Sequence, residues 1–64
     1  MEEKDLIWTA TVAFAKNMDY EDLYYSDYMY GKEDETEKVW DYVDELRENG
    51  RTAFYEKYKD YKLY

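Results

Sequence analysis

The residues best suited to chemistry in this 64-residue chain are its carboxylates, since seventeen Asp and Glu stand against nine Lys and Arg. Five recur on one side of a predicted helix over residues 34–50: Glu37, Asp41, Asp44, Glu45 and Glu48. Eleven rises of about 1.5 Å separate the first from the last, about one carboxylate per 4 Å. A DNA strand carries a phosphate per about 3.4 Å of axis. The array therefore predicts a surface that imitates a nucleic-acid backbone and occupies the basic, phosphate-binding groove of a DNA- or RNA-handling protein.

Two basic residues flank this array and would reduce its negative charge. Lys38 and Arg47 lie three residues from Asp41 and Asp44, respectively. Side chains three apart on a helix are neighbours, so both cations can form ion pairs with these carboxylates.

A second acidic stretch, residues 19–28, adds aromatic rings to the predicted surface. Asp22 and Asp27 extend the row of carboxylates, while Tyr24 and Tyr28 could stack or form hydrogen bonds as nucleic-acid bases do. These tyrosines also support an alternative function, a general protein-interaction module that binds through exposed Tyr24, Tyr28 and Tyr55. Such a module could also form a homodimer.

Catalysis lacks its usual residues in this chain. There is no His, no Cys and a single serine, Ser26, so no Ser–His or Cys–His pair can be assembled. A carboxylate pair would need a cleft that raises one pKa, and a single small domain has little room for one. Gly31 and Gly50 are the only glycines, which excludes a phosphate-binding loop, and the acidic clusters lack EF-hand spacing. We expect no enzyme, no cofactor and no dedicated metal site.

Charge and composition indicate the kind of partner. A net charge of −8 repels nucleic acid and anionic membranes and attracts a basic protein. The longest apolar run, residues 6–15, is too short to span a bilayer, and the N-terminal residues lack a signal-peptide pattern, so we expect a cytoplasmic protein. The composition, small, acidic, tyrosine-rich and free of cysteine, is similar to that of phage-encoded inhibitors that imitate DNA. This similarity is compositional and assigns no residue.

The C-terminal tail has the opposite charge. Residues 1–50 hold fifteen acidic and five basic side chains, net −10, whereas residues 51–64 hold two and four, net +2. The tail interleaves its cations with Phe54, Tyr55, Tyr58 and Tyr61, a pattern typical of contacts with single-stranded nucleic acid. This is a second alternative function, which the overall negative charge opposes. The sequence favours a structural role for the tail, in which its aromatic side chains cover the core while its lysines balance the acidic helix or bind the acidic helix of a second copy.

The helix over residues 34–50 is the most clearly specified element. Its apolar side chains gather on one face: Val39, Trp40, Tyr42, Val43 and Leu46. Asp34 and Glu37 have the spacing of a capping box at its start. Gly50 can adopt the positive φ that ends a helix without a steric cost.

The remaining elements are predicted as strands. Residues 6–15 alternate bulky and small side chains and are rich in β-branched types, residues 23–30 are rich in tyrosine, and residues 51–64 also alternate. Helical spacing stays an alternative for each segment. The sequence thus predicts one small α+β domain over residues 1–64, an antiparallel sheet with one amphipathic helix in the order β-β-α-β, with an all-α fold as the alternative.

Overall fold

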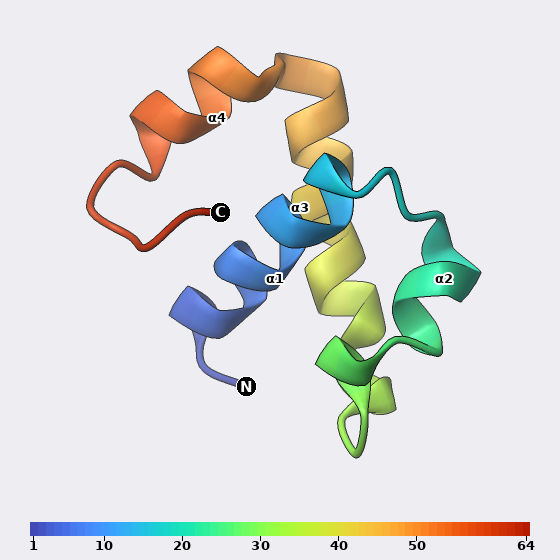
Figure 1. The fold of residues 1–64 in the computed structure, drawn as a ribbon. Helices are drawn as coiled ribbons and strands as arrows, with labels where there is room; N and C mark the ends of the chain where they lie inside the picture. Colours follow the sequence, from blue (N-terminus) through green and yellow to red (C-terminus); the bar gives the residue numbers. More distant parts are fainter.

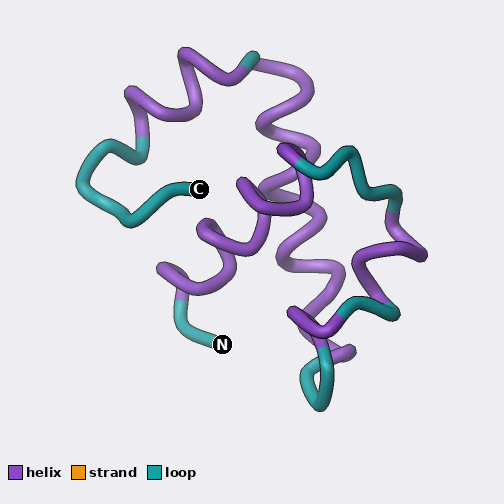
Figure 2. Tube along the Cα trace, in the orientation of Figure 1, coloured by secondary structure: helices purple, strands orange, loops and turns teal.

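The chain folds entirely into helices and their connections, without a β-strand (Figures 1 and 2). The computed structural model describes all 64 residues. Its elements are α1 (Glu3–Ala15), α2 (Tyr20–Tyr24), the 3₁₀ turns η1 (Asp27–Met29) and η2 (Glu33–Glu35), α3 (Thr36–Asn49) and α4 (Arg51–Lys57). The predicted α+β class with its β-β-α-β order is therefore wrong, and the all-α alternative describes the fold. None of the helices combines the length and the apolar character that crossing a membrane requires.

The N-terminal apolar run forms α1 and not the predicted strand over residues 6–15. More than half of the helix is buried: Leu6, Ile7, Thr9, Ala10, Thr11, Val12 and Ala13. A helix that is apolar around most of its circumference belongs inside a fold, so its sequence carries no polar stripe and its alternating bulky residues imitate a strand. Burial thus outweighs the strand preference of the β-branched residues.

The other two predicted strands are also wrong. Residues 23–30 contain the end of α2, a short turn and η1, and they are held by two buried side chains, Leu23 and Met29, in place of an alternating face. In the tail, residues 51–57 form α4, and the helical spacing of Phe54 and Tyr58 is the pattern that the structure follows. Neither segment has a neighbouring strand with which its backbone could form the hydrogen bonds of a sheet.

The predicted helix over residues 34–50 is confirmed, with a different start. It runs over Thr36–Asn49 and directly continues η2, so Asp34 lies inside a helical turn and cannot serve as an extended N-cap. The predicted capping box of Asp34 with Glu37 is absent; Thr36 Oγ1 instead donates to the Glu33 carbonyl at 2.8 Å. Gly50 ends the helix with φ at +88°, as predicted, although its ψ of 158° is extended and leads straight into α4.

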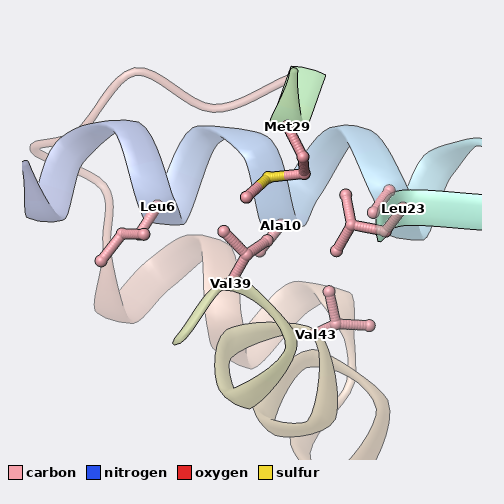
Figure 3. Close-up of a cluster of buried hydrophobic side chains, with 7 residues drawn as sticks. Leu6, Ala10, Leu23, Met29, Val39 and Val43 are labelled. Carbon is pink, nitrogen blue, oxygen red and sulfur yellow. The ribbon is translucent and has the colours of Figure 1, made fainter. Parts of the chain in front are cut away.

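The larger hydrophobic cluster lies where α1 packs against α3. It consists of seven buried residues: Leu6, Ala10, Ala13, Leu23, Met29, Val39 and Val43. Figure 3 shows Leu6 and Ala10 on α1 and Val39 and Val43 on α3, with Met29 completing the group from η1. Val39 and Val43, which the sequence places on the apolar face of this helix, are buried, but they pack against a helix and not against the predicted sheet.

A smaller cluster joins the C-terminal part of the chain to α1. Ile7, Leu46 and Phe54 are its fully buried members. Aromatic and aliphatic side chains pack around them: Phe14, Tyr42, Tyr55, Tyr58, Tyr61 and Leu63. After α4 the chain returns toward α1 (Figure 1), where the last residue's backbone N–H donates to Thr11 Oγ1 at 3.0 Å. Partly buried rings thus add apolar contact where a chain this short has few aliphatic residues.

Candidate functional site

The predicted acidic array lies on α3, but only four of its five carboxylates are free. Glu37, Asp41, Asp44 and Glu48 are exposed and form no ion pair. Their spacing places them within an arc of about 60° along about 17 Å of helix; we call these four residues the acidic stripe. Glu45 is half-buried and faces α4, where Lys57 Nζ and the Tyr58 hydroxyl each lie 3.0 Å from its carboxylate.

The two cations beside the acidic stripe bind elsewhere, so the ion pairs that the sequence allows with Asp41 and Asp44 do not form. Lys38 Nζ lies 3.1 Å from Glu35, and it is the main cause that holds the pKa of the Glu35 carboxyl below its usual value, followed by the N-terminal amine. The Arg47 guanidinium lies 5.5 Å from the centre of the Trp40 ring. The acidic stripe is therefore not neutralised by its neighbours.

The cations of the tail are largely used within the molecule. Lys57 binds Glu45, Lys59 lies 3.8 Å from Glu56, and the Arg51 guanidinium lies 5.1 Å from the centre of the Tyr55 ring. Lys62 alone among the four forms no ion pair or cation–π contact. The aromatic side chains between these cations pack around the smaller cluster, so the tail serves mainly to hold α1, α3 and α4 together.

Four tyrosines of the C-terminal half donate hydrogen bonds inside the molecule. They are Tyr42, Tyr55, Tyr58 and Tyr61, and we call them the bonded tyrosines. Tyr42 and Tyr61 both donate to Glu3, at 3.3 and 2.6 Å, which ties the N-terminus of α1 to the C-terminal half. Burial is the main cause that raises the pKa of Tyr42 and Tyr58, and the bond to Glu3 raises the pKa of Tyr61.

The five tyrosines of residues 17–31 behave differently. None of their hydroxyls has a hydrogen-bond partner in the protein: Tyr20, Tyr24, Tyr25, Tyr28 and Tyr30. Tyr25 and Tyr30 are 80% and 81% exposed, and Tyr20 and Tyr24 reach 39% and 36%. Residues 17–31 also hold four acids and no base. We call this stretch the tyrosine segment.

Local capping explains how so short a segment is held in place. The Asp19 side chain accepts from the Asp22 backbone N–H at 2.8 Å, and Asp22 accepts in return at 3.2 Å, which forms the capping box of α2. Leu23 and Met29 fill the core, and Tyr20 meets Trp40 of α3 edge to face at 5.7 Å. With these anchors fixed, Glu21, Tyr24, Tyr25, Asp27 and Tyr30 remain exposed to solvent.

The structure distributes the predicted site residues over two surfaces. Asp22 is used as a helix cap, Asp27 is exposed at the start of η1, and Tyr28 is half-buried with its ring 6.0 Å from Trp8. Tyr24, Tyr28 and Tyr55 were predicted to be exposed, and only Tyr24 is. Tyr55, like Tyr28, is half-buried, and its hydroxyl donates to the backbone carbonyl of Tyr64 at 2.7 Å.

Four exposed residues of the tyrosine segment are not among the site residues predicted from the sequence: Tyr20, Glu21, Tyr25 and Tyr30. The signal that could have found them is the absence of any Lys or Arg between Lys16 and Lys32. Because the segment contains no cation, none of its rings is covered by a Lys or Arg side chain.

Two open hollows mark the surface. The larger lies between α1 and the tail and is lined by Lys4, Asp5, Trp8, Asp60, Tyr61 and Lys62, whose charges balance. The smaller has a volume of about 410 Å³ and is lined by Tyr20, Glu21, Tyr24 and Tyr25. No group of three or more acidic side chains is gathered as a metal site would require.

No protein family, curated protein or solved structure shows significant similarity to this chain.

Proposed function

We propose that the chain is a non-catalytic protein-binding domain whose contact surface is the tyrosine segment. The observation that carries the proposal is the division of the tyrosines. The bonded tyrosines donate to groups of the same molecule, whereas those of the tyrosine segment have hydroxyls without a partner and, at Tyr25 and Tyr30, nearly free rings.

Tyrosine suits such a surface for physical reasons. It contributes a large contact area with only two side-chain torsions to immobilise, and its hydroxyl can form a hydrogen bond at the edge of the interface. Tyrosine is accordingly enriched at protein interfaces. A cluster of exposed rings held on a capped helix and a 3₁₀ turn therefore loses little conformational entropy on binding.

Charge supports a basic protein as the partner. The tyrosine segment contributes four carboxylates to a molecule of net charge −8, which accelerates encounter with a positively charged surface and disfavours acidic ones. The rings would then supply most of the lasting contact, because exposed ion pairs at the rim of an interface add little affinity.

Affinity purification with two matched variants tests this proposal. The first carries Tyr25→Ser and Tyr30→Ser, and the second carries Glu37→Gln, Asp41→Asn, Asp44→Asn and Glu48→Gln. All six positions are exposed, so both variants should keep the helical circular-dichroism spectrum. A specific partner lost with the first variant and kept by the second supports the proposal; a partner that behaves in the opposite way contradicts it.

A nucleic-acid mimic is the second candidate function, and the acidic stripe is the observation that favours it. Its four carboxylates are exposed and free of ion pairs, against about five phosphates on the same 17 Å of one DNA strand. Such an inhibitor would bind in the basic groove of a DNA- or RNA-handling protein, would be displaced by duplex DNA and would depend on the acidic stripe. Competition by duplex DNA in the same purification decides this candidate.

A further inference from the structure

We propose that the hollow lined by Tyr20, Glu21, Tyr24 and Tyr25 binds the guanidinium group of an arginine side chain. The inference deepens the protein-binding function proposed above and rests on it only for the source of the arginine. The ligand chemistry is that of a weakly hydrated organic cation, which guanidinium and quaternary ammonium groups share.

The walls of the hollow have the composition that such a cation needs. Three of its four lining residues are aromatic and the fourth is a carboxylate. The rings of Tyr24 and Tyr25 are 5.0 Å apart with an interplanar angle of 79°, and an edge-to-face pair leaves ring faces open to a third group. A cation over a ring face is attracted by the negative face of the π-system, and Glu21 adds its charge at the same place.

The rest of the molecule shows how this chain pairs its aromatic residues with cations. Arg47 lies over Trp40, Arg51 over Tyr55 and Lys57 over Tyr58, at 5.5, 5.1 and 5.1 Å. No Lys or Arg of the chain lies over a ring of this hollow, and the tyrosine segment holds none. The hollow therefore presents aromatic faces and a negative charge without a cation of its own.

The larger hollow offers an internal comparison. It also has two aromatic residues, Trp8 and Tyr61, but Lys4 and Lys62 line it together with two aspartates. Its own lysines already supply positive charge next to the rings. The smaller hollow differs from the larger one in that no Lys or Arg lines it, so it is the one suited to a cation from a partner.

Arginine fits better than lysine. The guanidinium is planar, stacks on aromatic faces and is less strongly hydrated than an ammonium group, and it can also direct two N–H donors to a carboxylate such as that of Glu21. Because the hollow is open to solvent, an isolated arginine side chain should bind it only weakly. In a complex, the hollow would fix the position of one arginine of the basic partner.

Titration of the ¹⁵N-labelled protein followed by NMR tests the proposal directly. The probes are N-acetyl-arginine amide, N-acetyl-lysine amide, tetramethylammonium and the uncharged arginine isostere N-acetyl-citrulline amide. We expect arginine to shift the amide signals of residues 20–25 and citrulline to leave them in place. Tyr25→Leu should weaken arginine binding about two- to five-fold, the range for one exposed cation–π contact, and Glu21→Gln should weaken it as well.

Tyr30→Leu is the matched control, since Tyr30 is as exposed as Tyr25 and lies outside the hollow. Equal binding of citrulline and arginine, or equal losses in the two Tyr→Leu variants, would overturn the proposal. Tighter binding of tetramethylammonium than of arginine would reassign the site to quaternary ammonium ligands. Tyrosine-dependent capture of a partner without arginine binding would refute the cation site alone, whereas arginine binding without any partner would refute the protein-binding function alone.

Discussion

Replacing Tyr58 by phenylalanine removes one hydroxyl group and should lower the free energy of unfolding, whereas the same change at Tyr30 should not. The Tyr58 hydroxyl donates to Glu45 at 3.0 Å in a half-buried position, and its ring lies 4.5 Å from that of Phe54. Phenylalanine keeps the ring contact, so the change isolates the hydrogen bond. A bond to a carboxylate contributes about 1.5 to 3 kcal/mol; since Lys57 also binds Glu45, we expect a loss of about 1 to 2 kcal/mol.

Urea unfolding followed by circular dichroism measures this difference. With a slope of about 1 kcal/mol per M for so small a domain, the midpoint for Tyr58→Phe should fall by about 1 to 2 M. Tyr30→Phe, which removes a hydroxyl without a partner, should stay within about 0.5 kcal/mol of the unmodified protein. A double-mutant cycle with Glu45→Gln should show coupling between the two changes. Equal midpoints for Tyr58→Phe and Tyr30→Phe would refute the division of the tyrosines on which the proposed function depends.

Three further outcomes test other parts of the structure. Thr11→Val should cost about 0.5 to 1.5 kcal/mol in urea unfolding, because the hydrogen bond from the backbone N–H of exposed Tyr64 to Thr11 is lost; a neutral result would argue against this contact between the returning tail and α1. Gly50→Ala should cost about 1 kcal/mol or more by the same assay, since φ at +88° strains any residue with a Cβ; a stabilising effect would contradict this backbone geometry. The raised pKa values of Tyr42, Tyr58 and Tyr61 mean that the unfolded chain ionises first, so their stabilising effect is complete below about pH 10 and is lost as the pH rises through the folded-state pKa values. Unfolding midpoints that stay constant above about pH 10 would argue against these contacts.

The sequence predicted α3 well because that helix has one charged, solvent-exposed face and one buried apolar face. Val39, Val43 and Leu46 recur at helical spacing among charged residues, and Gly50 closes the segment. Its first turn was predicted less well, because the choice between Asp34 and a later cap depends on whether the preceding residues are themselves helical. That is set by η2, for which local sequence gives only a weak signal.

The error at α1 has a different physical origin. Period-based reasoning needs one exposed face, and α1 is covered on most sides by α3, η1 and the returning tail. Its Thr9 and Thr11 are buried like the apolar residues, so neither marks a polar face. Thr11 is satisfied by the Trp8 carbonyl and by the end of the chain, 53 residues away. Contacts at such distances along the chain cannot be read from a local pattern.

The same dependence on distant contacts decides which tyrosines are available to a partner. Ten tyrosines look alike in the sequence, yet Glu3 and Glu45 accept hydrogen bonds from three of them, and these pairings join residues 13 to 58 positions apart. A carboxylate used in this way is also lost from the acidic surface, as Glu45 is. The tyrosines of residues 17–31 form no such hydrogen bonds, because the acidic residues of this segment either cap α2 or face solvent. The segment also contains no cation that could cover a ring. The proposed binding surface therefore consists of side chains that the fold leaves without partners, and tertiary contacts, not composition, distinguish Tyr25 and Tyr30 as its most exposed rings.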